Sequence, residues 1–272
     1  MIVDTHCHVS PFWYEPVEGL IHHMEANCVS HAVLVQYMGQ FDNSYLFNCL
    51  SRFPDKFVVV PLVDHNATPA LDEVAGLQSR GAVGIRLRPD SRSPSEDPYA
   101  IWKLCERLGL VISCSGSMEE FASSEFADLV SSVPRLQIVL EHMGSINHPL
   151  QEQPPFPLRR AVFRLGKFPN VNLKIHGLGE FSIRKKPHDG GFIFRPEALG
   201  IVELAFEAFG ADRVMWGSDY PPVSGREGYR NALLLTSEHI SRLYGEGVLA
   251  KVLGHNAARI FKIGRARTEA VR

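Results

Sequence analysis

The sequence lacks an excess of positive charge. Its 272 residues include 28 Lys and Arg against 30 Asp and Glu, which gives a formal net charge of −2. Proteins that bind nucleic acid gain most of their non-specific affinity from a surplus of basic side chains that neutralise phosphates. We therefore expect no nucleic-acid partner.

Long hydrophobic runs are absent as well. Stretches such as residues 57–63 end after a few residues, whereas a helix needs about 20 apolar residues to cross a bilayer. The first six residues contain neither the basic region nor the apolar region of a secretory signal. We expect a cytoplasmic protein with no membrane association.

Cysteine is scarce, and its number is odd. The five cysteines are scattered along the first half of the chain, at positions 7, 28, 49, 105 and 114. A chain of this length can build its own hydrophobic core. The cysteines are therefore typical of reduced thiols in the cytoplasm rather than of a disulfide framework.

What the sequence does contain is a repeated alternation of two kinds of segment. Short runs rich in β-branched residues predict strands, and longer amphipathic stretches between them predict helices. The eight predicted strands are residues 2–9, 31–37, 57–63, 82–88, 109–115, 137–142, 171–176 and 213–219. The predicted helices include residues 69–80, 99–108, 119–130 and 196–209.

Helix-start signals accompany two of these predicted helices. Asn66 and Thr68 precede the helix at 69–80 as candidate caps. Ser117 and Glu120 have the spacing of a capping box, in which each side chain accepts a hydrogen bond from the backbone of the other residue.

Eight strand–helix units favour a closed parallel barrel. A doubly wound open sheet also alternates strands with helices and is the main alternative. Against it, the Gly-rich phosphate-binding turn that follows the first strand of dinucleotide-binding folds is missing here. We predict the α/β class and a single (β/α)8 TIM-barrel domain over residues 1–272, with loops at 147–157 and 177–195.

Polar residues collect at the predicted C-terminal ends of strands, where barrel enzymes place their active sites. The first predicted strand contains Asp4, His6 and His8, and residues two apart on a strand face the same way. Two imidazoles beside a carboxylate can bind a divalent metal such as zinc. The alternative is a set of ordinary polar strand residues, and this pattern alone does not decide between them.

Three later strands end in the same manner, with His142, His176 and Asp219. A single histidine at a strand end is more often a polar residue paired within the fold than a catalyst. Several strands that bring imidazole or carboxylate to one end are harder to explain in this way. We therefore interpret the set as an active site.

These residues occur in motifs that resemble the amidohydrolase superfamily. The motifs are His6-Cys7-His8, Glu141-His142-Met143-Gly144 and Gly217-Ser218-Asp219-Tyr220-Pro221, and the closing segment at 254–261 is similar too. The resemblance extends from residue 2 to about residue 262. It is to the amidohydrolase-related branch, whose members include 2-pyrone-4,6-dicarboxylate lactonases, sugar lactonases and aminocarboxymuconate semialdehyde decarboxylases.

The resemblance implies a divalent metal, with zinc as the expected ion, held by His6, His8, His142 and Asp219. It also implies that Asp219 is the general base that takes a proton from water, and that His142 contacts this water or the substrate. His176 is a candidate general acid for a leaving alcohol, or a hydrogen-bonding partner of the substrate.

One position departs from the branch. Its metal-dependent members usually carry a histidine at the end of the fifth strand, where this sequence has Cys114. A thiolate is a suitable zinc ligand, but free cysteine is commonly a small buried side chain, and we favour the buried thiol. The dicarboxylate-lactonase type resembles this sequence in that departure and is thought to work without a metal, so the metal requirement stays open.

Basic residues on two strands suggest how the substrate is held. Arg86 and Arg88 alternate on one predicted strand, and Lys174 lies one pleat below His176 on another. A guanidinium inside a barrel is costly unless it is paired, and a substrate carboxylate would pair it through two hydrogen bonds. Internal salt bridges from the arginines to Asp4 or Glu141 are the equal alternative.

We predict a hydrolase that opens a small carboxylated lactone by attack of water. The alternative is a zinc-dependent, non-oxidative decarboxylase of an aromatic or muconate-type acid. The basic run at 184–186 is a candidate to close over an anionic substrate, although a solvated charge run is the commoner structure. The sequence leaves a homo-oligomer open.

Overall fold

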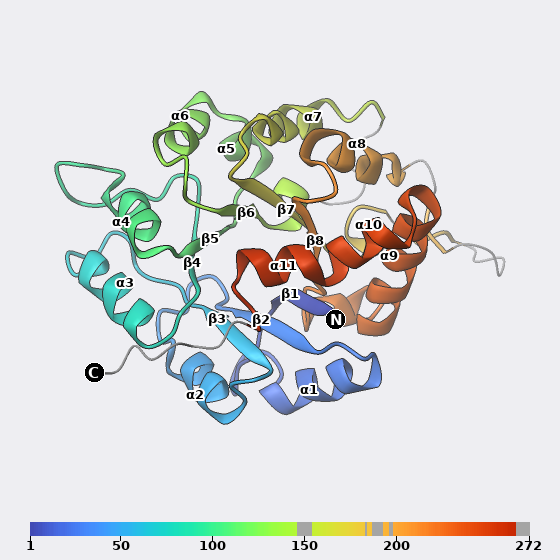
Figure 1. Ribbon diagram of the computed structural model, residues 1–272, viewed down its shortest axis with the longest axis horizontal. Helices are drawn as coiled ribbons and strands as arrows, with labels where there is room; N and C mark the ends of the chain where they lie inside the picture. Colours follow the sequence, from blue (N-terminus) through green and yellow to red (C-terminus); the bar gives the residue numbers. More distant parts are fainter. Residues whose placement is uncertain (146–153, 183, 187–192, 196–197, 265–272) are drawn as a thin grey trace.

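Eight parallel strands form the centre of the molecule in a computed structural model that describes residues 1–145, 154–182, 184–186, 193–195 and 198–264 (Figure 1). They pair in chain order as one sheet of three strands and one of five. The strands are β1 (Val3–Cys7), β2 (His31–Val35), β3 (Phe57–Val60), β4 (Gly84–Leu87), β5 (Val111–Cys114), β6 (Ile138–Leu140), β7 (Val171–Ile175) and β8 (Val214–Trp216). All eight predicted strands are confirmed, and each is shorter than predicted.

The two sheets meet at both edges. Between β3 and β4, the backbone N–H groups of Val83 and Arg86 donate to the carbonyl groups of Val59 and Pro61. Between β8 and β1, the N–H of Asp219 donates to the His6 carbonyl at 2.8 Å. The strands therefore form a ring in the arrangement of a (β/α)8 barrel, which is the predicted fold class.

Helices surround this ring (Figure 1). They are α1 (Val17–Ala26), α2 (Ser44–Arg52), α3 (Ala70–Ser79), α4 (Ala100–Leu108), α5 (Met118–Ala122), α6 (Ser124–Ser132), α7 (Pro157–Phe163), α8 (Gly200–Phe209), α9 (Tyr229–Tyr244), α10 (Glu246–Ala250) and α11 (Asn256–Ile260). Short 3-10 turns lie at η1 (His142–Gly144), η2 (Arg164–Lys167), η3 (Leu178–Glu180) and η5 (Pro222–Gly225), and a π-helical turn, η6 (Lys251–His255), precedes α11. No described helix is both long enough and apolar enough to cross a bilayer.

One end of the barrel is closed by apolar side chains. Val3, Val111 and Met215, which lie on three different strands, cluster with Ile260 and Phe261 at the end of α11. Figure 1 shows α11 lying across the strands. Because this end is filled with hydrophobic side chains, the polar strand ends are left to form the opposite mouth.

Two details of the helix predictions are corrected by the structure, and the start of the helix predicted at 196–209 lies partly outside the described residues. Ser117 and Glu120 form the predicted capping box of α5, but the helix predicted at 119–130 is divided at Ser123, whose hydroxyl accepts a hydrogen bond from Phe126 and begins α6. The prediction that Asn66 and Thr68 cap α3 is wrong, because Pro69 precedes this helix and no side chain caps it.

The two predicted loops lie partly outside the described residues. Residues 146–153, 183 and 187–192 are not among them. In the described part of the second loop, Arg184 and Phe194 form an antiparallel bridge, and the N–H of Lys185 donates to the Ile193 carbonyl at 2.9 Å. The segments 184–186 and 193–195 therefore run side by side beyond the end of β7.

Candidate active site

The end of β1 brings His6 and His8 to the mouth of the barrel. The expectation that Asp4 faces the same way is wrong, because the pairing of β1 with β2 shifts register between Asp4 and Cys7, which breaks the alternation. The Asp4 carboxylate instead accepts hydrogen bonds from the N–H and hydroxyl of Ser218, at 2.8 and 2.6 Å, and from the Tyr229 hydroxyl at 3.0 Å. Asp4 thus joins β1 to the segment after β8, and burial raises its pKa to about 6.

His6 and His8 meet Asp219 across the mouth. The Nε2 atoms of His6 and His8 lie 4.0 and 3.9 Å from Oδ1 of Asp219. Two bonds of about 2.1 Å from one zinc ion would span such separations. His8 Nδ1 lies 2.7 Å from the Val35 carbonyl, to which it donates, so His8 Nε2 keeps its lone pair for a ligand.

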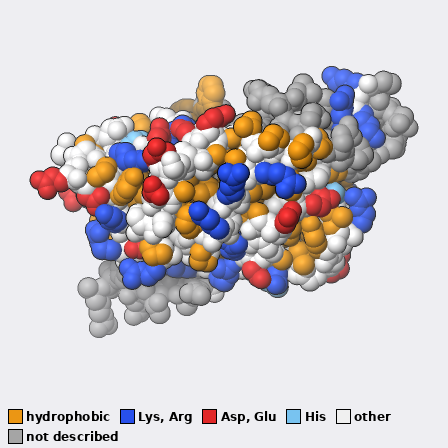
Figure 2. All heavy atoms as spheres, turned by 90° about the horizontal axis from the view of Figure 1, so that it is seen from above, with side chains coloured by type: hydrophobic (Ala, Val, Ile, Leu, Met, Phe, Trp, Pro, Cys, Tyr) orange, Lys and Arg blue, Asp and Glu red, His pale blue; other side chains and the backbone are white. Residues whose placement is uncertain are grey.

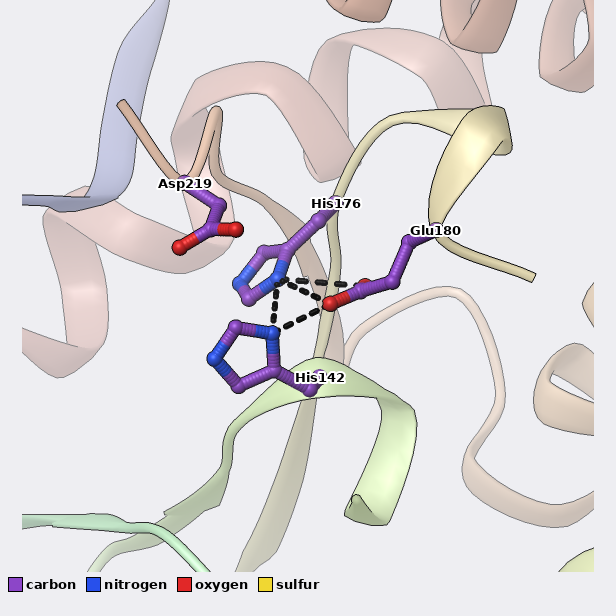
Figure 3. Close-up of side chains that lie close together, drawn as sticks. All are labelled: His142, His176, Glu180 and Asp219. Atoms are coloured by element: carbon purple, nitrogen blue, oxygen red, sulfur yellow. Dashed lines mark hydrogen bonds and ion pairs between the residues drawn. The ribbon is translucent and has the colours of Figure 1, made fainter. Parts of the chain in front are cut away.

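His142 and His176 lie between Asp219 and Glu180 (Figure 3), and their ligand atoms are within 4.8 Å of both carboxylates. They follow β6 and β7, and their Nδ1 atoms are 2.8 Å apart. The Glu180 carboxylate contacts both rings: Oε1 bonds to His142 Nδ1, and Oε2 lies 3.2 Å from His176 Nδ1. Four imidazoles and the carboxylates of Asp219 and Glu180 therefore converge. The sequence predicted that the four histidines and Asp219 would meet here, but not Glu180.

Sequence reasoning missed Glu180. The residue lies in the segment predicted as a loop, and the 3-10 turn η3 folds it back onto the histidine four positions earlier. A carboxylate four residues after a strand-end histidine was the available signal, but it becomes meaningful only once the turn is known.

The backbone at this mouth is strained where it carries functional groups. His142 and Asp219 have φ values of +51° and +59°, in the left-handed region that costs a non-glycine residue about 1 kcal/mol or more. A β-carbon at Gly217 would lie 2.8 Å from the His6 β-carbon, so only glycine allows the segment after β8 to approach β1 this closely.

Burial keeps most of these imidazoles neutral. Desolvation lowers the pKa of His8 to about 4, and it also lowers the pKa of His6 and of His176. Burial would lower the pKa of His142 too, but the Glu180 carboxylate beside it raises that pKa above its ordinary value. Neutral imidazoles have the free lone pairs that a divalent cation requires.

The donors present therefore fit a divalent metal ion. Three groups of residues bring their ligand atoms within 4.8 Å of one another: His6, His8 and Asp219; His6, Glu141 and His142; and His142, His176, Glu180 and Asp219. Cys114, the residue at the end of β5, belongs to none of these groups within the described residues. Its thiol is fully buried, and burial raises its pKa well above the ordinary value.

Arg86 and Lys174 lie beneath the histidines in a closed network. Arg86 donates from Nε and Nη2 to the two carboxylate oxygens of Glu141, at 3.1 and 2.6 Å, and from Nη1 to the Gln36 carbonyl at 2.8 Å. Lys174 Nζ lies 2.8 Å from the Ser113 hydroxyl and 3.1 Å from His6 Nδ1. Of the two alternatives for Arg86, the structure shows the internal pair with Glu141.

Arg88 does not share the position of Arg86. It follows the end of β4, is 39% exposed, and pairs with Asp90 and with Glu120 of the α5 capping box. The structure therefore does not bring Arg86 and Arg88 together as two free guanidinium groups at the mouth.

A basic cavity opens beside Asp219 instead. Its volume is about 590 Å³, and its lining includes Arg184, Lys186, Arg195 and Arg226. Arg226 Nη1 lies 3.0 Å from Oδ2 of Asp219, so the cavity adjoins the candidate metal-binding residues directly. Within the described part of the chain, the side chains of Arg184, Lys186 and Arg195 make no ion pair.

The surface as a whole is not basic. On the face drawn in Figure 2, acidic and basic side chains mix over most of the area, and several basic ones gather at one end next to the grey segments. The group of cations is therefore local in a protein of net charge −2, which does not favour general attraction to polyanions.

Comparisons with known proteins bear on the family and the fold of the chain. The chain is 27% identical over 255 residues to an L-fucono-1,5-lactonase from Burkholderia ambifaria, which covers 87% of this chain and 81% of that protein. Its fold is similar to a zinc-bound amidohydrolase from Burkholderia multivorans, with a TM-score of 0.78 at 18% identity over 97% of this chain and 99% of that one. A 2,6-dihydroxybenzoate decarboxylase from Rhizobium has a TM-score of 0.66 at 16% identity, over 96% and 98% of the two chains.

The amidohydrolase family model matches residues 3–263, which includes every residue of the site described above. The chain therefore belongs to the amidohydrolase family and is an enzyme of the amidohydrolase superfamily.

Proposed function

We propose that this enzyme opens a small carboxylated lactone by attack of water, with Asp219 as the general base. The observation that carries the proposal is the position of the Asp219 carboxylate. One of its oxygens faces His6 and His8, and the other is held by Arg226 at the edge of the basic cavity. The 27% sequence identity to an L-fucono-1,5-lactonase supports the same class of reaction.

The two Asp219 oxygens have different tasks in this mechanism. Oδ2 is bonded to Arg226, which fixes the plane of the carboxylate. Oδ1 takes the proton from the attacking water, whose oxygen forms the new bond to the lactone carbonyl carbon. When the ring C–O bond breaks, Asp219 returns this proton to the leaving alkoxide, so the product is a hydroxy acid.

His6, His8, His142 and Asp219 would hold a divalent metal ion, with zinc as the proposed ion. Such an ion lowers the pKa of water and polarises the carbonyl oxygen. His142 lies within the cluster and keeps a small exposed fraction of 5%, and we propose that it contacts the water or the substrate. The carboxylate of the substrate would lie in the basic cavity, against Arg184, Lys186 and Arg195.

The role of Lys174 in this proposal is indirect. Its ammonium group is fully buried and lies against His6 Nδ1 and Ser113 rather than at the open mouth. It would balance the charge of Glu141, in place of the contact with substrate that the sequence suggested.

A panel of neutral and carboxylated lactones tests the proposal through proton release, followed with a pH indicator in weak buffer. We expect saturable turnover of a carboxylated lactone and a loss of at least about 1,000-fold in kcat for Asp219→Asn, because the amide cannot accept the proton. Full activity of the variant would overturn the mechanism. Release of carbon dioxide from an aromatic or muconate-type acid, without lactone turnover, would favour the decarboxylase alternative.

A further inference from the structure

His176 and Glu180 have no part in the mechanism above, yet they are among the most buried polar groups at the mouth. The His176 side chain is fully buried, and Glu180 is nearly so. Placing an imidazole and a carboxylate out of contact with water costs free energy unless both are well partnered. Their contacts indicate what they do.

Glu180 accepts from two imidazoles at once. Its Oε1 bonds to His142 Nδ1 and lies 3.3 Å from His176 Nδ1, and its Oε2 is 3.2 Å from His176 Nδ1. A carboxylate only accepts, so in this position it favours the tautomer with a proton on Nδ1 in each ring. The two Nδ1 atoms are 2.8 Å apart, so both N–H groups must point at the shared carboxylate rather than at each other. The lone pair of each neutral ring is then on Nε2, on the side away from Glu180.

Those Nε2 atoms point into the cluster. In Figure 3 the Nε2 side of both rings faces away from Glu180 and lies on the same side as Asp219. The ring of His176 is 4.8 Å from the ring of His6, centroid to centroid. Among the described residues, the Nε2 atoms of His176 and of His6 are both buried without a hydrogen-bond partner.

Two buried imidazole nitrogens without a hydrogen-bond partner are unusual beside a carboxylate, because buried polar atoms nearly always have a partner. A cation bound between the two nitrogen atoms would be a partner for both. A carboxylate that accepts the remote N–H of a metal-binding histidine is also the usual support of such ligands.

We propose that His176 is a metal ligand through Nε2, and that Glu180 is the positioning residue that directs the Nε2 atoms of His176 and His142 toward the metal. The ion is a divalent cation that accepts imidazole and carboxylate ligands, such as zinc. In this assignment the metal-binding imidazole comes from the end of β7. The end of β5 carries Cys114 and supplies no imidazole. His176 then binds the metal and does not donate a proton to the leaving alcohol.

Zinc binding by the protein without substrate tests this assignment. Metal-free full-length protein is titrated with Zn²⁺ in competition with a chromophoric chelator, and its circular dichroism spectrum verifies that each variant is folded. We expect Glu180→Gln to weaken zinc binding by about 10- to 100-fold, because the amide is uncharged and keeps only one acceptor oxygen for the two rings. We expect His176→Gln to weaken it at least as much, and Glu180→Asp to restore part of the affinity.

Cys114→Ser is the matched control, since it changes the other candidate ligand. We expect it to bind zinc as the unaltered protein does. The Co²⁺-substituted protein should lack the intense near-ultraviolet absorption of a thiolate ligand. A loss of affinity in Cys114→Ser, or that absorption band, would assign the ligand to β5 and overturn the proposal.

Unchanged zinc affinity in both Glu180→Gln and His176→Gln would overturn it as well, as would an unaltered protein that binds no zinc. These measurements contain no lactone. Their outcome is therefore separate from whether the proposed reaction is correct, and a failure of one proposal can be told from a failure of the other.

Discussion

Two groups of basic side chains lie near the histidine cluster, and they differ in whether a partner is already present. Arg86 and Lys174 are buried beneath the cluster, where Glu141 and Ser113 satisfy them. Arg184, Lys186 and Arg195 line the open cavity and make no ion pair among the described residues. A charge that is paired within the fold contributes to stability, whereas an unpaired charge at a cavity is free to bind an anion. Substitution in the buried group should therefore change the free energy of unfolding, and substitution at the cavity should change the binding of the substrate.

The largest effect is expected from Arg86→Met. This change leaves the Glu141 carboxylate buried without its two-point partner, and breaking a buried pair in this way typically costs about 3 to 5 kcal/mol. Urea denaturation measures the free energy of unfolding. The double variant Arg86→Met with Glu141→Met should lose less stability than Arg86→Met alone, because no unpaired buried charge remains.

Arg52→Ala is the control for this prediction. Arg52 pairs with Glu18 on the surface, where both side chains are well exposed, and such pairs contribute about 0 to 1 kcal/mol. An Arg86→Met variant that loses no more stability than Arg52→Ala would contradict the expectation that Arg86 is needed to compensate the buried Glu141 carboxylate.

The pH dependence of stability gives a second, smaller effect. Burial alone would raise the pKa of Glu141, but Arg86 and Lys174 hold it well below its ordinary value of 4.5. The unfolded chain therefore takes up a proton at a higher pH than the folded protein. The contribution of Glu141 is complete above about pH 4.5 and is lost as the pH falls below that value.

Urea denaturation at pH 6, 5 and 4 checks this direction. Unaltered protein should lose more stability between pH 5 and pH 4 than the Arg86→Met, Glu141→Met double variant, which lacks the shifted carboxyl group. Equal losses in the two proteins would show that Glu141 is not held in its charged form by the network.

The sequence predicted the strands and the four residues His6, His8, His142 and Asp219 because strand ends are marked by local patterns. The pairing of Arg86 with Glu141 joins β4 to the residue after β6. The sequence could offer this pair only as one of two alternatives, because the choice depends on strand register and tilt, which no local pattern reveals. Nor does a local pattern reveal the direction of Asp4, which is reversed by an irregularity in β1, or the position of Glu180, which reaches His176 through a single turn. Alternation along a strand finds candidate residues, but contacts between strands decide their roles.

The smallest effect is expected at the open cavity, and it should appear in binding alone. Arg184→Ala and Lys186→Ala each remove a cation that has no partner in the described structure, so neither should change the free energy of unfolding by more than about 0.5 kcal/mol. For a carboxylated lactone we expect KM to rise by roughly tenfold in the double variant, with kcat nearly unchanged, because the carboxylate contact is made equally in the bound substrate and in the transition state.

A neutral lactone should show no such change in KM, and Lys56→Ala, which removes a surface lysine paired with Glu25, should affect neither substrate. High salt should weaken binding of the carboxylated lactone in the unaltered protein and much less in the double variant, because screening acts on the contact that the variant lacks. If the double variant keeps the original KM for the carboxylated substrate, the anion is held elsewhere. The open cations would then be ordinary surface charges, and the difference between the two basic groups would be one of exposure only.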